Sequence, residues 1–155
     1  MDVWYFAYGS NLLRSQMERR VGPARETPDA PRRAYLAGHQ VVFNKFGRNN
    51  IDIYANLAPA DSTVIGAVYC CDAVAMQKLD GFEQGYERKT VLVTDDAGAQ
   101  FEAVAYFATP EHTVEEAPPT DAYLRRIVEG AREFGIPEPY VVSLLRQAGR
   151  ADDWA

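Results

Sequence analysis

The sequence predicts an α+β fold built around a mixed β-sheet. Two observations support this class: strand-like and helical segments alternate irregularly, and a β-hairpin follows the second expected helix. The 155 residues have the length of one domain, and 47% of them are hydrophobic, which is ordinary for a protein with a core. We therefore expect residues 1–155 to fold as a single domain.

Strand signals begin near the amino terminus. Residues 3–8 are apolar on both faces, as expected of a strand in the middle of a sheet or barrel. Residues 34–46 combine alternating and aromatic residues and suit one or two strands, with Gly38 as the break. Residues 64–71 are rich in β-branched and aromatic side chains, which favour strands.

A hairpin is expected in the second half of the chain. Residues 86–94 and 100–107 flank the sequence Asp-Asp-Ala-Gly-Ala at 95–99, whose composition is typical of a turn. Residues 45–50 are expected to form a loop, and residues 109–119 a polar loop with three prolines.

Four helices are expected from apolar residues at helical spacing and from their terminal residues. Asp and Thr are expected at two N-caps, Pro near the start of the last helix, and Gly at or beyond three ends. The expected helices are residues 11–20, the segment from Asp72 to Gly81, the segment from Thr120 to Gly135, and the segment from Ile136 to about Ala148.

Composition limits the partners and the compartment. The net charge of −6 argues against nucleic-acid or membrane binding, because both need a basic surface. Cys70 and Cys71 are adjacent, so a disulfide between them would be strained, and within a strand they point to opposite faces. Besides them the chain has only His39 and His112 as imidazole ligands, and we expect no metal site. Without a signal peptide or a membrane-spanning run, the expected compartment is the cytoplasm.

The turn Gly9-Ser10-Asn11 is a candidate binding loop. It lies between an apolar strand and a helix, where backbone N–H groups point outward without partners and the helix dipole adds partial positive charge. A carboxylate or phosphate suits such a place. The alternative is that Ser10 or Asn11 only caps the next helix.

The residues around this turn resemble a known family. YFAYGSNL at residues 5–12 is similar to the substrate-cradle signature of the γ-glutamylcyclotransferase family. LDGFE at 79–83, followed by GYER at 85–88, resembles the segment that ends in the family's catalytic glutamate. PPTDAY and GIPEPY, within residues 118–140, resemble its closing helix pair. The resemblance spans nearly the whole chain and implies a small mixed β-barrel flanked by helices.

The resemblance also implies an activity and a set of site residues. The family cleaves γ-glutamyl amides by intramolecular attack, giving 5-oxoproline and a free amine or amino acid, without a cofactor. Glu83 matches the catalytic glutamate. The residues expected to bind substrate are Tyr5, Phe6, Ala7, Tyr8, Gly9, Ser10, Tyr106 and Tyr123. Residues 51–58 resemble the segment that lines the barrel near the site, although Asp52 and Tyr54 stand where smaller residues are commoner.

The implied reaction requires a glutamate with a raised pKa. The glutamate must take a proton from the substrate's α-ammonium, so its pKa must be raised by burial. Phe82 is expected to provide an apolar wall, and Asp80 a like-charged neighbour. The alternative for Glu83 is a solvated surface residue, and for Tyr106 and Tyr123 it is packing in the core.

Three other functions remain open at this point. The chain could be a specialist for one γ-glutamylamine or a γ-glutamyl-protected biosynthetic intermediate, or a non-catalytic module that binds a small carboxylate. A hydrolase or acyltransferase using Cys70 or Cys71 lacks a placed histidine and ranks last. The amine half of the substrate is expected to meet residues 45–54 and 109–119, and the chain could be a monomer or a homodimer.

Overall fold

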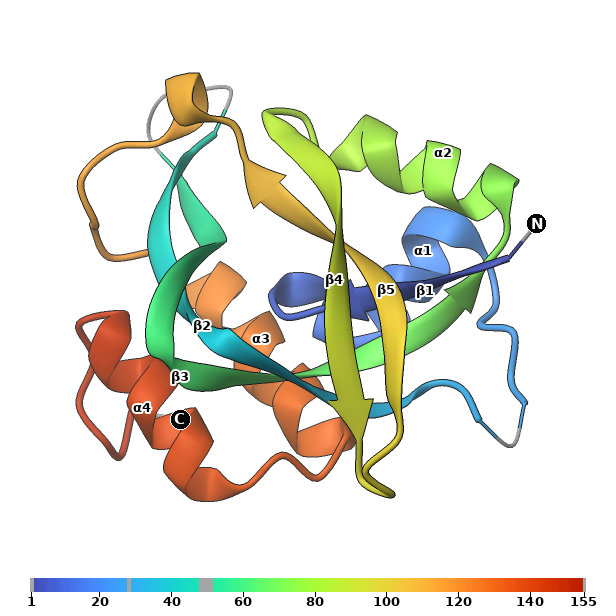
Figure 1. Cartoon of the computed structure of the whole chain (residues 1–155). Coiled ribbons are helices and arrows are strands. Elements are labelled where there is room, and N and C mark those ends of the chain that lie inside the picture. The colour runs from blue at the N-terminus through green and yellow to red at the C-terminus, as the bar shows by residue number, and fades with distance from the viewer. Residues whose placement is uncertain (1, 28, 48–51, 155) are drawn as a thin grey trace.

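The fold is a closed five-stranded barrel with helices packed around it, which confirms the predicted class. The computed structural model describes residues 2–27, 29–47 and 52–154. The strands are β1 (Val3–Ala7), β2 (Arg32–Phe46), β3 (Ile53–Cys71), β4 (Tyr86–Asp95) and β5 (Gln100–Ala108), joined in the order β1-β3-β2-β4-β5 (Figure 1). The helices are α1 (Arg14–Val21), α2 (Ala73–Phe82), α3 (Asp121–Glu133) and α4 (Glu138–Gln147), with the short 3₁₀ turns η1 (Ser10–Leu12) and η2 (Pro110–His112).

Strand β1 occupies an inner position in the barrel, as its two apolar faces predict. It pairs antiparallel with β3 from Val3 opposite Cys71 to Ala7 opposite Ala67. On its other side it lies parallel to β5, with Tyr5 opposite Val104. This parallel contact makes the sheet mixed.

The β2–β3 pair is longer than the sequence predicts. β3 is one strand, and residues 59–63, which separate two segments considered apart in the sequence, belong to it. Pro59 and Thr63 pair with β2. Pro59 is tolerated because it lies at a register shift between Ala37 and His39, where Gly38 has a φ of 76°. Lys45 also lies in β2, so the loop expected over 45–50 begins too early. Residues 48–50 of that loop lie outside the described residues.

The helices differ from the predictions mainly at their ends. The expected helix over residues 11–20 is divided into η1 and α1, because Leu13 between them is extended (φ −72°, ψ 111°). Asp72 caps α2 by accepting a hydrogen bond from the Ala75 N–H, and α2 continues through Gly81 to Phe82. Glu83 is therefore the first residue after α2.

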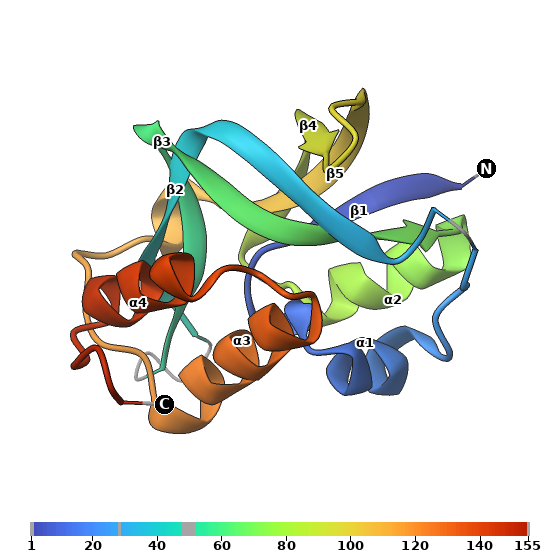
Figure 2. The same cartoon turned by 90° about the horizontal axis from the view of Figure 1, so that it is seen from below.

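Helices α1, α3 and α4 lie together on one side of the barrel, as the view from below shows (Figure 2). Gly130 permits close packing of α3 on η1, since a Cβ at this position would lie 2.4 Å from the backbone of Leu12 and Leu13. The packing of α3 against η1 fixes the Gly9–Ser10 bend relative to the barrel.

In the part of the chain that the structure describes, none of the helices has the length and the apolar composition needed to span a bilayer.

Candidate active site

A cavity of about 450 Å³ opens where the end of β1 meets α2 and α3. Its lining comes from all five strands, the bend after β1, and helices α1, α2 and α3. The lining residues are Tyr5, Tyr8, Gly9, Ser10, Asn11, Arg20, Lys45, Gly47, Tyr54, Ala55, Gly81, Phe82, Glu83, Gln84, Tyr86, Tyr106, Tyr123 and Arg126. Residues far apart in the sequence therefore line one cavity, and six of these eighteen residues are tyrosines.

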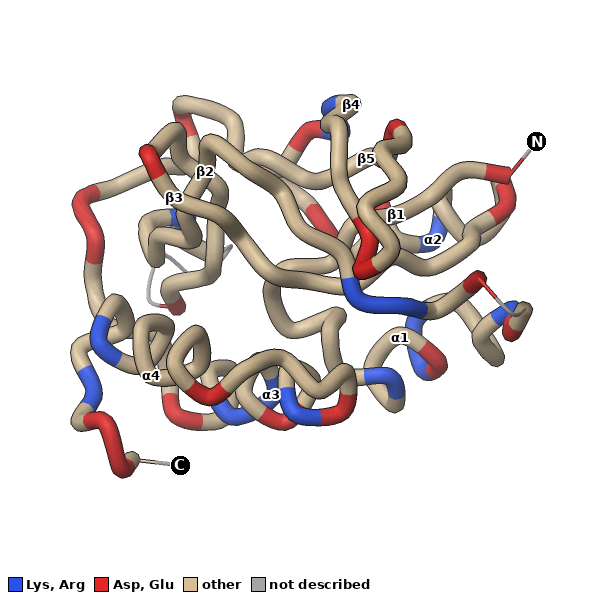
Figure 3. Tube along the Cα trace, turned by 60° about the horizontal axis from the view of Figure 1, so that its bottom comes forward, with Lys and Arg blue, Asp and Glu red and all other residues tan. Residues whose placement is uncertain are grey.

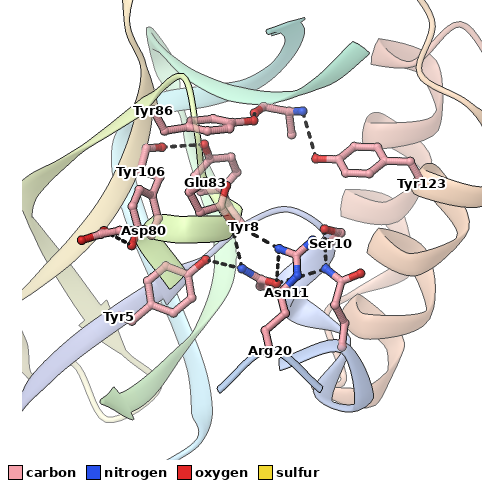
Figure 4. A network of polar contacts seen from close by, with 12 residues as sticks. Tyr5, Tyr8, Ser10, Asn11, Arg20, Asp80, Glu83, Tyr86, Tyr106 and Tyr123 are labelled. Atoms are coloured by element: carbon pink, nitrogen blue, oxygen red, sulfur yellow. Dashed lines mark hydrogen bonds and ion pairs between the residues drawn. The ribbon is translucent and has the colours of Figure 1, made fainter. Parts of the chain in front are cut away.

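Glu83 lies in this cavity with its carboxyl group largely withdrawn from water. Its side chain is 15% exposed. Its Oε1 accepts a hydrogen bond from Asn11 Nδ2 at 3.1 Å and lies 3.6 Å from Nη1 of Arg20 (Figure 4). The alternative of a solvated surface glutamate is wrong for this structure. The expected wall from Phe82 is also weaker than predicted, because that side chain is 54% exposed with the Arg20 guanidinium over its ring.

Burial raises the pKa of Glu83 above its ordinary value. The positive charges of Arg20 and Lys45 and the hydrogen bond from Asn11 act in the opposite direction, and Asp80 adds a smaller upward effect. The loss of water outweighs the attraction to the two cations, because the Arg20 contact is an ion pair at 3.6 Å and not a close bidentate one. Glu83 therefore holds a proton at a higher pH than an exposed glutamate does.

Asn11 is the centre of the polar network around Glu83. Its Oδ1 accepts hydrogen bonds from Gln16 Nε2 (3.0 Å) and Arg20 Nη1 (3.1 Å). Because a guanidinium has only donors, this contact fixes which end of the amide faces Arg20. Its Nδ2 then donates to Glu83 and to the hydroxyl of Tyr5 at 3.0 Å. Neither Ser10 nor Asn11 makes a side-chain cap, so the capping alternative is wrong.

The tyrosines of the cavity are held by hydrogen bonds to the barrel. The Tyr8 hydroxyl donates to the carbonyl oxygen of Tyr106, and the Tyr86 hydroxyl to that of Ala55, each at 2.6 Å. The Tyr123 hydroxyl accepts from the Ala55 N–H at 3.0 Å. Burial raises the pKa of each of these phenols, so all of them are neutral donors or acceptors near neutral pH.

Seven of the nine residues expected in the site meet at this cavity: Tyr5, Tyr8, Gly9, Ser10, Glu83, Tyr106 and Tyr123. The structure does not bring Phe6 and Ala7 to it. Both are fully buried in the core, Phe6 among the barrel side chains and Ala7 beside Met17 and Met76. Among the described residues, no group of three His, Cys, Asp or Glu side chains is placed to hold a metal ion.

Sequence reasoning missed several polar and aromatic residues of the cavity. Asn11 was expected in the candidate binding loop, and Lys45 and Tyr54 in segments expected near the substrate, but none of the three was given a role of its own. Arg20, Tyr86 and Arg126 were missed. Lys45 had a usable signal, since a lysine amid the apolar and aromatic residues of β2 is unusual. It is only 5% exposed, and its Nζ lies 4.9 Å from the ring centre of Tyr86 and 5.5 Å from that of Tyr54.

The ionised side chains that line the cavity are mostly basic. Arg20, Lys45 and Arg126 face one carboxylate, that of Glu83. The surface nearby is different: acidic and basic residues alternate along α3 (Figure 3). The excess of positive charge is thus a property of the cavity, and it suits a ligand with carboxylate groups.

The barrel and this cavity define a protein of the γ-glutamylcyclotransferase-like class. The chain belongs to the AIG2-like family, which residues 63–144 match. A solved structure named as a gamma-glutamyl cyclotransferase is 27% identical, with 93% of this chain and 86% of that chain covered and a TM-score of 0.79. An uncharacterised human protein is also 27% identical (99% and 91% covered, TM-score 0.77).

A yeast γ-glutamyl cyclotransferase specific to glutathione shares the fold, with 16% identity, 96% and 98% coverage and a TM-score of 0.62. No curated protein matches the sequence.

Proposed function

We propose that this protein is a γ-glutamyl cyclotransferase that cleaves γ-glutamyl amides and releases 5-oxoproline with a free amine or amino acid. One observation carries the proposal: the carboxyl group of Glu83, with its raised pKa, shares a cavity with the Gly9–Ser10 bend. A fold relative that is 27% identical and named for this activity adds support. The reaction needs no cofactor, because the nucleophile and the electrophile belong to one substrate.

In the proposed reaction Glu83 acts first as base and then as acid. Its carboxylate takes a proton from the substrate's α-ammonium, and the freed amine attacks the γ-carbonyl carbon to close a five-membered ring. A C–N bond forms, and the carbonyl oxygen becomes an oxyanion. When the oxyanion collapses, the original amide C–N bond breaks and Glu83 returns its proton to the leaving nitrogen. The ring nitrogen loses its second hydrogen as a proton, which the released amine takes up to leave as an ammonium ion. A raised pKa suits both transfers, because it brings the carboxyl closer to the working pH.

The charge of the cavity favours an amino acid as the leaving half. A γ-glutamyl amino acid carries two carboxylates and one ammonium, whereas a γ-glutamylamine with an uncharged side chain carries one of each. Three cations and one carboxylate line the cavity, which matches the first pattern better. We therefore propose γ-glutamyl amino acids over γ-glutamylamines, and we expect competition between γ-glutamylglycine and γ-glutamylethylamine to favour the former. An equal preference would contradict this part of the proposal.

The activity itself is tested by measuring 5-oxoproline released from a panel of γ-glutamyl dipeptides and γ-glutamylamines. The wild type should turn over at least one compound, and Glu83→Gln should lower kcat by about 10²–10⁴-fold, the range for loss of a general acid–base. Glu87→Gln is the matched control, since Glu87 is exposed on β4 outside the cavity. If wild type and Glu83→Gln release 5-oxoproline equally fast, the assignment fails.

The same protein samples test the non-catalytic alternative. Calorimetry that shows binding of 5-oxoproline without turnover of any γ-glutamyl amide would favour a small-carboxylate binding module.

We propose the cytoplasm as the site of action, where the thiols of Cys70 and Cys71, both free in the structure, would stay reduced.

A further inference from the structure

The hydroxyl groups in the cavity differ in whether their proton is already used. A phenol has one proton to donate, and its oxygen can still accept. A hydroxyl that donates to the protein can therefore only accept from a ligand, whereas one that accepts from the protein still has its proton available. The partners of each tyrosine show which case applies.

Four tyrosines of the cavity already donate their protons to the protein. Tyr8 and Tyr86 each donate to a backbone carbonyl oxygen. Tyr106 donates to Oδ1 of Asp80 at 2.6 Å, and Tyr54 to Oδ2 of Asp52 at 3.4 Å. None of these oxygen acceptors has a proton to give in return, since carbonyls and ionised carboxylates only accept. The direction of each bond is thus fixed by chemistry.

Two tyrosines show the opposite arrangement. Tyr123 accepts from the N–H of Ala55, and Tyr5 accepts from Nδ2 of Asn11, whose orientation Arg20 fixes. Within the described residues, neither hydroxyl donates to a protein acceptor. The protons of these two hydroxyls are therefore available to a ligand.

The Ser10 hydroxyl also accepts, from Gln16 Nε2 at 2.6 Å, and the two available tyrosine protons lie in different parts of the cavity. Asn11 Nδ2 donates both to the Tyr5 hydroxyl and to Glu83 Oε1, so the Tyr5 hydroxyl lies beside the proposed base. The Tyr123 hydroxyl lies against the bend, because a Cβ built on Gly9 would be 3.3 Å from its oxygen. Glycine at position 9 therefore lets the bend and the Tyr123 hydroxyl approach each other closely. Figure 4 shows Tyr123 reaching in from α3, across the cavity from Glu83.

We propose that Tyr123 is a catalytic residue whose O–H donates to the oxyanion formed at the γ-carbonyl, together with backbone N–H groups of the Gly9–Ser10 bend. This inference rests on the proposed function and assigns one donor to the reacting oxygen. The Ala55 N–H orients the phenol, because the hydroxyl oxygen accepts from it and the proton then points elsewhere. Tyr86 and Tyr106 cannot take this role, since their protons are already used.

The test is Tyr123→Phe, which removes the hydroxyl and keeps the ring that packs on Tyr54. Loss of one oxyanion donor should lower kcat by about 10²-fold, with kcat/KM lowered equally because the interaction is made in the transition state. Tyr140→Phe is the matched control. Tyr140 lies outside the cavity lining, and its hydroxyl accepts a hydrogen bond from the backbone of Ile65 on β3, as Tyr123 does from Ala55.

Thermal denaturation and the kinetics together separate the outcomes. Both variants lose a similar bond and should show similar decreases in Tm, and Tyr140→Phe should keep wild-type kcat. A Tyr123→Phe protein that folds and also keeps wild-type kcat would overturn this inference while leaving the role of Glu83 intact. A wild type that releases no 5-oxoproline from any γ-glutamyl amide would instead overturn the proposed function.

Discussion

Two carboxylates of this protein have similar partners and opposite shifts in pKa. Asp96 accepts from Nη2 of Arg33 (2.8 Å) and from the hydroxyl of Tyr35 (2.7 Å), its side chain is 53% exposed, and its pKa is lowered. Glu83 has Arg20 and an amide donor beside it, is 15% exposed, and has a raised pKa. The kind of partner therefore does not decide whether the pKa of a carboxyl group rises or falls. The distance to the cation and the loss of water on burial decide the direction of the shift.

The largest effect in this comparison is expected from Asn11→Ala. The substitution removes the donor that positions the Glu83 carboxyl and releases both Tyr5 and Arg20. We expect kcat/KM to fall by about 10²-fold, since small displacements of a catalytic group cost that much. Asn44→Ala is the control, because Asn44 makes its amide contact with Asn56 outside the cavity lining. Equal rates in the two variants would show that Asn11 does not position the base.

The pH dependence of the reaction should report the raised pKa of Glu83. The base must be ionised to accept a proton, so kcat/KM should fall as the pH is lowered through the folded-state pKa. We expect the midpoint of this acid limb to lie above the ordinary glutamate value of about 4.3. A rate profile measured with one substrate checks it. A limb centred at or below the ordinary value would mean that burial does not control this group.

Removing the arginine beside each carboxylate should raise both pKa values, from different starting points. Arg20→Gln takes away a cation that lowers the pKa of Glu83, so the acid limb should move to higher pH than in the wild type. Arg33→Gln should bring the pKa of Asp96 up toward its ordinary value without altering the rate profile. If Arg20→Gln leaves the limb in place, the 3.6 Å ion pair has no electrostatic role.

The smallest expected effect is on stability, and its sign differs between the two sites. For Glu83 the folded protein binds its proton more tightly than the unfolded chain does, so stability falls as the pH rises from the ordinary pKa through the folded one. Glu83→Gln should therefore have a higher Tm than wild type above that window. A lower Tm at neutral pH would contradict the burial argument.

For Asp96 the linkage runs the other way. Its lowered pKa gives a contribution that is present above the ordinary aspartate pKa and lost as the pH falls through the folded one. Asp96→Asn should lower Tm at neutral pH by about a degree or less, because an exposed ion pair contributes little. The difference from wild type should vanish in acid. Denaturation curves at neutral and acid pH measure both variants.

Features with local signals were predictable from the sequence. The hairpin turn at residues 95–99 forms as expected, with Asp95 accepting from the N–H groups of Ala97 and Ala99 and Gly98 at a φ of 83°. The Asp72 cap of α2 also needs only neighbouring residues. The barrel itself came from the family resemblance, because its closure depends on long-range pairs such as Tyr5 with Val104.

The site was also predictable only in part, because some of its residues come together through long-range packing that has no local sequence signal. Glu83 and the Gly9–Ser10 bend have sequence signatures, so both were identified. Arg20 reaches the cavity from α1 through packing, and no local pattern indicates its destination. Lys45 has only the weak signal of a lysine among the apolar and aromatic residues of β2. Phe6 and Ala7 were expected at the site because a whole motif was carried over, but both side chains are fully buried in the core away from the cavity lining.

The central claim is that withdrawal from water raises the pKa of the Glu83 carboxyl group above that of an exposed glutamate. The most direct measurement is an NMR titration of the side-chain carboxyl carbons, assigned by comparison with Glu83→Gln and Asp96→Asn. The account predicts a Glu83 midpoint above about 4.3 and an Asp96 midpoint below about 3.9, the ordinary values for these side chains. A Glu83 midpoint at or below its ordinary value would contradict it.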